Sequence, residues 1–196
     1  MPTDSATDLE NLRDLQRGEA AALDRLVNRW QRPLLAFAYR YVQNSADAQD
    51  LVAETFVRLY QRRMGLRPDT NLPAWLFTAL SNLCHNLHRW KRRHPTVSLG
   101  APQAGGEAPL DPESAEDSPG AAMIRDEAVS ALREAVDALP HDLKVTVLLH
   151  HYEHLPYRQI GEVVGCSERG VETRLYRARQ LLRTELARFV GEAAPR

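Results

Sequence analysis

Residues 155–179 read Leu-Pro-Tyr-Arg-Gln-Ile-Gly-Glu-Val-Val-Gly-Cys-Ser-Glu-Arg-Gly-Val-Glu-Thr-Arg-Leu-Tyr-Arg-Ala-Arg, and this pattern predicts two short helices joined by a tight turn. The first helix carries one apolar face, formed by Ile160, Val163 and Val164. Gly165 stands where the chain must turn, a position that suits a residue without a Cβ atom. Ser167 can cap the second helix, and Val171 and Leu175 would anchor that helix to a core.

Two more residues of the first helix fit a helix-turn-helix. Pro156 suits a first helical position, because its missing N–H would have no partner there, and Gly161 is small where a second helix would cross closely. The second helix turns a polar and basic face outward, made of Glu172, Thr173, Arg174, Tyr176, Arg177 and Arg179. This face suits the phosphates and base edges of a DNA groove, although an amphipathic hairpin with a solvated basic face is the alternative.

Chain length, net charge and cysteine content limit the class of protein. The chain has 196 residues, so we expect one or two domains, and its net charge of −1 means that nucleic-acid binding must come from local patches. Its two cysteines, Cys84 and Cys166, are far apart, which favours reduced thiols in a cytoplasmic protein. The polar N-terminus is unlike a signal peptide and no apolar run approaches a membrane span, so we expect no membrane insertion.

Helical periodicity recurs along the whole chain, while the alternation typical of strands is almost absent, so the predicted class is all-α. Thr7-Asp-Leu-Glu10 fits a capping box and predicts a helix that ends near Gly18. A second helix is expected over residues 19–42, with Pro33 producing a kink or a short break.

A third helix is expected over residues 47–63, followed by a loop at residues 64–70. Its inward residues would be Val52, Phe56, Leu59 and Tyr60. Its other face is acidic and carries Asp47, Gln49, Asp50 and Glu54. A face of this kind is usually solvated, and the charges alone do not require a partner.

The fourth helix, over residues 72–94, carries two stripes. Its core stripe would be Leu76, Leu80, Leu83, Leu87 and Trp90. Its polar stripe is Thr78, Asn82, Asn86, Arg89 and Arg93. Amides and arginines beside aromatic residues suit unpaired bases, which they can bind by hydrogen bonding and stacking. The alternative is a helix end whose cations only complement the helix dipole.

A linker divides the chain. Residues 96–120 hold five acidic residues, four prolines and four glycines without a Lys or Arg, and such a segment is expected to be flexible. Two small helical modules, residues 8–95 and 121–190, would lie on either side of it. In the second module a helix over residues 123–139, with Ala128, Leu132, Ala135, Val136 and Leu139 inward, precedes another that starts at Pro140 and leads into the helix-turn-helix.

At this point the chain resembles a bacterial RNA polymerase sigma factor of the extracytoplasmic-function group. Residues 47–56, Asp-Ala-Gln-Asp-Leu-Val-Ala-Glu-Thr-Phe, look like the polymerase-docking helix of that family. Residues 74–83 and the Arg-rich run after them are similar to its promoter-melting helix, and residues 139–179 look like its second module. Each motif alone is weak, but their order and spacing make the resemblance specific.

The resemblance implies a role for three groups of residues. Docking on the clamp of core RNA polymerase would use Asp47, Gln49, Asp50, Glu54 and Phe56. Recognition and melting of the −10 element would use Arg67, Trp75, Asn82, Asn86, Arg89, Lys91, Arg92 and Arg93. Reading of the −35 element would use Ser167, Arg169, Glu172, Thr173, Arg174, Tyr176, Arg177 and Arg179. The resemblance also implies control by an anti-sigma factor, and a linker that threads the RNA channel of the polymerase rather than serving only as a tether.

The chain departs from the family pattern at a few positions. Glu172 occupies a recognition-helix position that is usually basic, so it would repel phosphate or accept from a cytosine amino group. Gln49 and Ala53 replace residues that are commonly acidic and Gln, and Gly161 replaces the usual Ala.

Two other classes of function remain open from the residues. A zinc-dependent hydrolase is the first, because His150 and His154 have a spacing that can bind zinc. The Glu that a metalloprotease needs directly after the first His is absent, so we expect no metal, no cofactor and no enzyme. A stand-alone helix-turn-helix regulator that binds duplex DNA as a dimer is the second alternative. It would leave the first module without a role, and the sequence has no long heptad segment for dimerisation.

Overall fold

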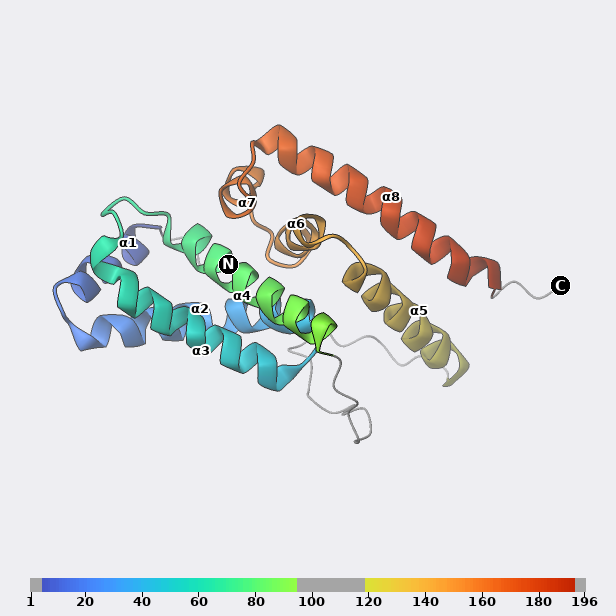
Figure 1. Cartoon of the computed structure of the whole chain (residues 1–196), viewed down its shortest axis with the longest axis horizontal. Helices are drawn as coiled ribbons and strands as arrows, with labels where there is room; N and C mark the ends of the chain where they lie inside the picture. Colours follow the sequence, from blue (N-terminus) through green and yellow to red (C-terminus); the bar gives the residue numbers. More distant parts are fainter. Residues whose placement is uncertain (1–4, 95–118, 193–196) are drawn as a thin grey trace.

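A computed structural model describes residues 5–94 and 119–192, and every regular element within them is a helix (Figure 1). The N-terminal group consists of α1 (Ser5–Gln16), α2 (Ala20–Val42), α3 (Ser45–Arg62), a 3-10 turn η1 (Arg63–Gly65) and α4 (Leu72–Arg93). The C-terminal group consists of α5 (Pro119–Asp137), α6 (His141–His151), α7 (Tyr157–Val164) and α8 (Glu168–Glu192). The predicted all-α class is thus confirmed.

Side chains before α3 and α4 set where these helices begin. Asn44 Oδ1 accepts a hydrogen bond from the Asp47 N–H at 2.9 Å, and Asn71 Oδ1 accepts one from the Ala74 N–H at 3.3 Å. The first N–H groups of a helix lack partners within it, so these asparagines stabilise both starts. The capping box predicted at Thr7 is wrong, because α1 begins before this residue and includes it.

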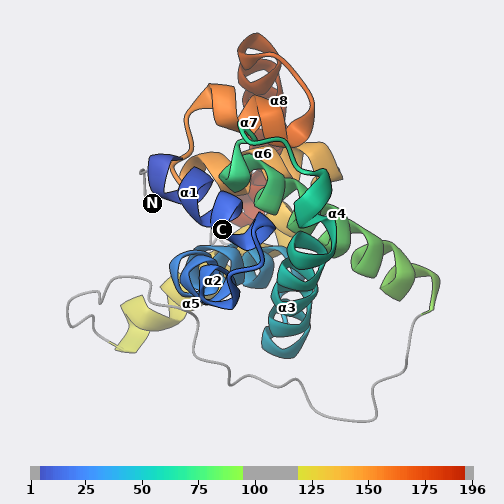
Figure 2. The same ribbon diagram turned by 90° about the vertical axis from the view of Figure 1, so that its left-hand side faces the viewer.

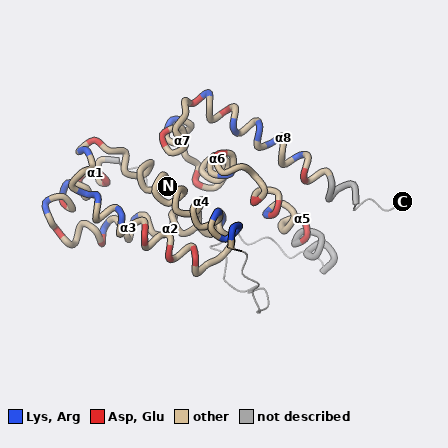
Figure 3. The backbone as a smooth tube through the Cα atoms, in the orientation of Figure 1, with Lys and Arg blue, Asp and Glu red and all other residues tan. Residues whose placement is uncertain are grey.

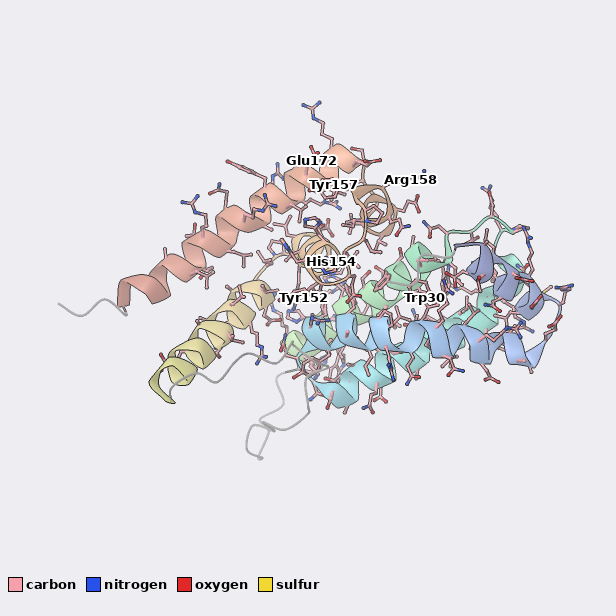
Figure 4. The ribbon with its side chains drawn as sticks, turned by 180° about the vertical axis from the view of Figure 1, so that it is seen from behind. Trp30, Tyr152, His154, Tyr157, Arg158 and Glu172 are labelled. Atoms are coloured by element: carbon pink, nitrogen blue, oxygen red, sulfur yellow. The ribbon has the colours of Figure 1, made fainter. Side chains whose placement is uncertain are left out.

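Aromatic side chains of α2 and α4 form the centre of the N-terminal group. Trp30 lies between these helices (Figure 4) and meets Phe77 edge-on, with ring centroids 6.4 Å apart. Phe37 contacts Phe77 in the same way at 5.5 Å. Trp30 Nε1 donates to Asp8 Oδ1 at 3.0 Å, which satisfies a buried indole N–H and ties α1 to the core. α2 continues through Pro33 without the break that the sequence allowed.

The C-terminal group is built around α8, which contacts α5, α6 and α7. The anchoring predicted for α8 is confirmed, since Val171 and Leu175 are buried together with Ala178. Figure 1 shows α5 and α8 running side by side at one end of the molecule. The start of α8 is therefore held against α6 and α7 while its outer face stays open.

The two groups pack against one another through α4 with α7 and α2 with α6, as Figure 2 shows from the side. Thr78 Oγ1 lies 3.4 Å from the Val163 carbonyl oxygen, to which it donates, and Asn71 Nδ2 donates to Glu162 Oε2 at 2.5 Å. These contacts place the first turns of α4 against the first helix of the helix-turn-helix.

A buried lysine joins α6 to α2. The side chain of Lys144 is 3% exposed, and its ammonium group donates to the Tyr41 carbonyl oxygen at 2.7 Å and to Asp137 Oδ1 at 2.6 Å. The same nitrogen lies 4.2 Å from the centre of the Tyr41 ring. A hydrogen bond of 2.8 Å joins the Tyr41 hydroxyl to His141 Nδ1. Because a buried ammonium needs partners, Lys144 depends on residues of both groups.

Glu153 and Tyr152, which follow α6, also face α2. Glu153 is 6% exposed, and its carboxylate lies 3.7 Å from the Arg40 guanidinium. Arg40 also stacks over the ring of Tyr152, 4.4 Å from the centroid, in the region that Figure 4 labels. Burial raises the pKa of Glu153 to about 7, against the attraction of Arg40.

Four apolar residues that the sequence pattern placed inward are exposed. Tyr60 is 46% exposed, Trp90 48% and Leu132 39%, and Ala128 is exposed as well. Tyr60 is instead covered by the Arg63 guanidinium, 3.9 Å from its ring centre. These predictions were wrong because helical periodicity does not show how far the neighbouring helices extend along a face.

The segment expected to be a linker lies almost wholly outside the described residues. Its last two positions, residues 119 and 120, belong to α5, so that helix begins earlier than predicted. Among the described helices, none is long and apolar enough to cross a membrane.

Candidate nucleic-acid interface

The turn of the helix-turn-helix is tightly closed. Gly165 ends α7 with φ +66°, a conformation that favours glycine, as predicted. Gly161 is also confined, but for a different reason than the crossing helix that the sequence suggested. A Cβ atom on Gly161 would lie 2.5 Å from the carbonyl oxygen of Cys166, and the Cys166 N–H donates to the Gly161 carbonyl at 2.9 Å. The turn itself therefore makes the close approach.

The start of α8 is capped by the residue before it, and its outer face is exposed. The Gly170 N–H donates to Ser167 Oγ at 3.2 Å, which confirms Ser167 as the cap. Besides Glu168, the exposed side chains of these turns include Arg169, Glu172, Thr173, Tyr176, Arg177 and Arg179. Figure 3 shows basic residues along α8, and Figure 4 marks Glu172 near its start. Six predicted DNA-contacting residues thus share one open, mainly basic face.

Arg174 departs from this arrangement. One of its guanidinium nitrogens donates to the Val164 carbonyl at 2.9 Å, and the other donates to Asp142 Oδ2 at 3.2 Å. The side chain is only 22% exposed. Arg174 therefore ties α8 to α6 and α7, and it would orient the face rather than lie on it.

A second polar surface follows α4. Asn82, Asn86, Trp90 and His94 are spaced four residues apart and are all exposed, so they form one ridge about 18 Å long. Trp90 stacks on His94, with ring centroids 5.1 Å apart and an interplanar angle of 26°. Arg89, Arg92 and Arg93 flank the ridge and are exposed too. Figure 3 shows this basic end of α4.

Trp90 is a candidate base-stacking residue that the sequence analysis did not include, because its helical spacing assigned it to the core. Its position within the run Arg-Trp-Lys-Arg-Arg was the available signal. An indole exposed between cations offers a flat surface on which an unpaired base can stack. Trp75, the tryptophan that was predicted for the −10 element, is only partly exposed and packs against the core.

The remaining residues predicted for the −10 element are less free. Arg67 lies before α4, where its guanidinium makes two hydrogen bonds with Asp69, at 3.0 and 2.7 Å. Lys91 forms an ion pair with Asp47 at the start of α3. In this arrangement neither side chain joins the ridge of Asn82 and Asn86.

The acidic residues of α3, marked red in Figure 3, lie beside an apolar groove that is lined by α2 and α3. Gln49 and Asp50 are exposed, and Glu54 accepts a hydrogen bond from Arg58 at 2.8 Å. Phe56 is 7% exposed and lines a groove of about 280 Å³ between α2 and α3. The predicted docking residues therefore combine open polar groups with one buried ring at the bottom of a groove.

The histidines and cysteines do not form a recognisable metal site. Within residues 5–94 and 119–192, no group of three potential ligands has suitable geometry. Burial raises the pKa of the Cys84 thiol to about 12, which makes it unreactive.

Comparison with known proteins decides the family. A model of sigma-70 region 2 matches residues 26–94, and a model of sigma-70 region 4 matches residues 130–182. The RNA polymerase sigma-H factor of Pseudomonas aeruginosa is 32% identical over 184 residues, which cover 91% of this chain and 93% of that relative. The chain belongs to the sigma-70 family, in its extracytoplasmic-function group.

Other relatives agree. The ECF RNA polymerase sigma factor SigE of Mycolicibacterium smegmatis is 32% identical, covering 90% of this sigma factor and 67% of its own length. The ECF RNA polymerase sigma-E factor of Haemophilus influenzae is 28% identical, with coverage of 92% and 95%. The resemblance stated from the sequence is therefore confirmed.

Two solved structures share the fold of this sigma factor. CnrH, in complex with the cytosolic domain of CnrY, aligns with a TM-score of 0.68 over 92% of this chain and 97% of its own, at 22% identity. The sigma factor RpoE of Bartonella quintana, in complex with the anti-sigma factor NepR, aligns with a TM-score of 0.57 over 84% and 96%, also at 22% identity.

Proposed function

We propose that this sigma factor binds core RNA polymerase and directs it to promoters, reading the −35 element with α8 and the −10 element with α4. The observation that carries the proposal is the ridge of Asn82, Asn86 and Trp90, which presents amides and an indole beside exposed arginines. A duplex-binding regulator needs only the basic face of α8. Groups suited to unpaired bases indicate a protein that also opens DNA.

Each of the three groups of predicted residues would have its own role. The exposed residues of α8, from Arg169 to Arg179, would contact phosphates and base edges in the major groove. The ridge on α4, with Arg89, Arg92 and Arg93, would hold one strand near the start of melting. The acidic residues of α3 and the groove at Phe56 would dock on the polymerase, which supplies the chemistry in the cytoplasm. The modules would span residues 8–95 and 121–190, with residues 96–120 between them.

Promoter binding would require the two helical groups to separate. By their names the −10 and −35 elements lie about 25 base pairs apart, which is about 85 Å along B-form DNA. A compact chain of 196 residues has a radius of gyration of only about 16 Å. With Thr78 against Val163, α4 and α7 are in direct contact and cannot reach both elements. The packed arrangement is therefore a closed state that core polymerase would open.

An anti-sigma factor is the expected controlling partner. Two solved structures with this fold are complexes, one with the cytosolic domain of CnrY and one with the anti-sigma factor NepR. A partner that favours the closed state would suppress activity without covering every DNA-contacting residue.

Footprinting with and without core polymerase tests the proposed function. The sigma factor alone should protect promoter DNA poorly, and together with core polymerase it should protect both elements and expose unpaired thymines to permanganate. Protection of a palindrome by the protein alone would instead support the stand-alone regulator.

A further inference from the structure

A cavity of about 580 Å³ lies between the two helical groups, beside the C-terminal half of α4. One wall comes from α2 and α4, and the other comes from the turn between α5 and α6 and the start of α6. Its nitrogen-bearing side chains are His85, His88, Arg89, Arg92, His141 and Lys144. The cavity exists only while the two groups are in contact, because neither group supplies both walls.

The lining is strongly cationic. Among the described lining residues Asp137 is the one carboxylate, and the buried ammonium of Lys144 already pairs with it at 2.6 Å. Arg89 and Arg92 form no ion pair with any described residue. They are three positions apart on α4, so their side chains are neighbours on the helix surface. Two guanidinium groups that line the cavity thus lack an anionic partner among the residues that the structure describes.

Three histidine side chains also line the cavity. The rings of His85 and His141 lie 4.2 Å apart, one from each group. Burial lowers the pKa of His141 to about 4, and burial also lowers the pKa of His88. Both rings are therefore neutral near pH 7, where each can donate one N–H to an acceptor, and an anion beside them would favour their protonation.

We propose that this cavity binds a small anion with two adjacent phosphate groups, such as pyrophosphate or a nucleoside diphosphate. Guanidinium groups match phosphate oxygens with paired hydrogen bonds, and two neighbouring arginines suit two linked phosphates. The imidazole of His141 on the opposite wall, and that of His88 on the same helix as the arginines, would complete the site. A single inorganic phosphate would engage fewer of these donors and should bind more weakly.

The ligand would favour the closed state, since it contacts walls from both groups and binds no site in the open protein. Arg89 and Arg92 also belong to the surface proposed for the −10 element. Occupation of the cavity would therefore compete with promoter binding, a consequence that rests on the proposed function, whereas binding of the anion does not.

Calorimetric titration of the full chain with pyrophosphate, ADP and inorganic phosphate, at constant ionic strength and without polymerase or DNA, tests the site. Arg92→Ala should weaken pyrophosphate binding by about tenfold or more. Arg93→Ala is the matched control, because it removes the same charge from the same helix end but lies outside the cavity, and it should change binding by less than about twofold. Equal losses in both variants, or no binding to the folded wild type, would overturn the proposal.

Histidine resonances give a second readout that general attraction to a basic helix end would not produce. Pyrophosphate should shift the side-chain NMR signals of His88 and His141 and leave that of His154, which is outside the cavity, in place. Shifts spread evenly over all histidines would contradict a defined site. If the wild-type protein binds pyrophosphate but does not direct core polymerase to promoters, that result would count against the proposed function and not against the anion site.

Discussion

The Lys144 ammonium, on α6, donates to the backbone carbonyl of Tyr41, on α2, at a distance of 2.7 Å and across 103 residues of sequence. This hydrogen bond is buried and charged, so it contributes more to the contact between the groups than an exposed ion pair would. It belongs to the proposed closed state, in which α4 and the helix-turn-helix are too close together to reach both promoter elements.

Lys144→Met should therefore shift the protein toward the open state. The loss of a charged, buried hydrogen bond costs about 1.5–3 kcal/mol, which corresponds to a tenfold or larger change in population. Small-angle scattering of the free chain should show a larger radius of gyration. The exposed Arg133, changed to Met, is the control and should leave the radius unchanged. A lower melting temperature with an unchanged radius would show that Lys144 stabilises only the C-terminal group.

Glu153→Gln should stabilise the protein above neutral pH. The pKa of Glu153 is raised from 4.5 to about 7 in the folded protein, so its stabilising contribution is complete below pH 4.5 and is lost as the pH rises through 7. The amide has no charge to bury. The variant should gain at most about 3 kcal/mol at pH 8 and nothing near pH 4.5. Urea unfolding at several pH values measures this, and an equal effect at all pH values would contradict it.

His141 has the opposite dependence. Its pKa is lowered from 6.5 to about 4, so its contribution is present above pH 6.5 and is lost as the pH falls through 4. In the wild type the two titrations offset one another between about pH 4.5 and pH 6.5. The Glu153→Gln variant should therefore reveal a stability that falls with acidification.

Gly161→Ala should destabilise the helix-turn-helix, even though alanine is usual at this position in the family. The new Cβ atom would lie 2.5 Å from the Cys166 carbonyl oxygen, which is backbone and cannot rotate away. We expect a loss of about 1–3 kcal/mol, together with weaker −35 binding. Gly65→Ala is the matched control, because nothing lies within 4 Å of its added Cβ atom. Two equally stable variants would show that the turn adapts.

Arg177 and Arg174 should respond differently to removal. Arg177 is exposed on α8, so Arg177→Ala should weaken −35-dependent binding and reduce its salt slope by about one. Arg174 bonds to Val164 and Asp142, so Arg174→Ala should lower the melting temperature and leave the slope nearly unchanged. Binding measured over a series of salt concentrations separates the two, and a slope for Arg177→Ala equal to that of the wild type would remove Arg177 from phosphate contact.

Asn82→Ala and Trp90→Ala should impair promoter melting while affinity for core polymerase stays unchanged. An amide and an indole on the ridge would each hold an unpaired base, and loss of a stacked base costs about 1–3 kcal/mol. Permanganate reactivity of promoter thymines reports melting. Asn28→Ala, at an exposed position on α2, is the control. Equal losses of core binding and melting would contradict a role in base binding.

The sequence predicts the turn of the helix-turn-helix correctly, although the capping box that it predicts at Thr7 is wrong. The turn predicted at Gly165 and the cap predicted at Ser167 are correct because a left-handed turn and a helix cap depend on the residue itself. Trp90 and Leu132 were misplaced because their burial depends on where other helices end. Arg174 looks like a surface cation until its two partners, on α6 and α7, are known.

The contact between the groups could not be read from the sequence. Lys144 and His141 reach Tyr41 only because α6 packs on α2, and no periodicity encodes a contact across 100 residues. The cavity at Arg89 and Arg92 depends on the same contact. The sequence therefore predicts the parts of a nucleic-acid interface but not the packed arrangement in which the structure holds them.

The most direct test of the central claim is genome-wide run-off transcription by core RNA polymerase with and without the purified protein. Stable binding to the core and a small set of new start sites, sharing two sequence blocks at a fixed spacing, is the predicted result. Start sites identical to those of core polymerase alone, from a protein that does bind the core, would contradict it.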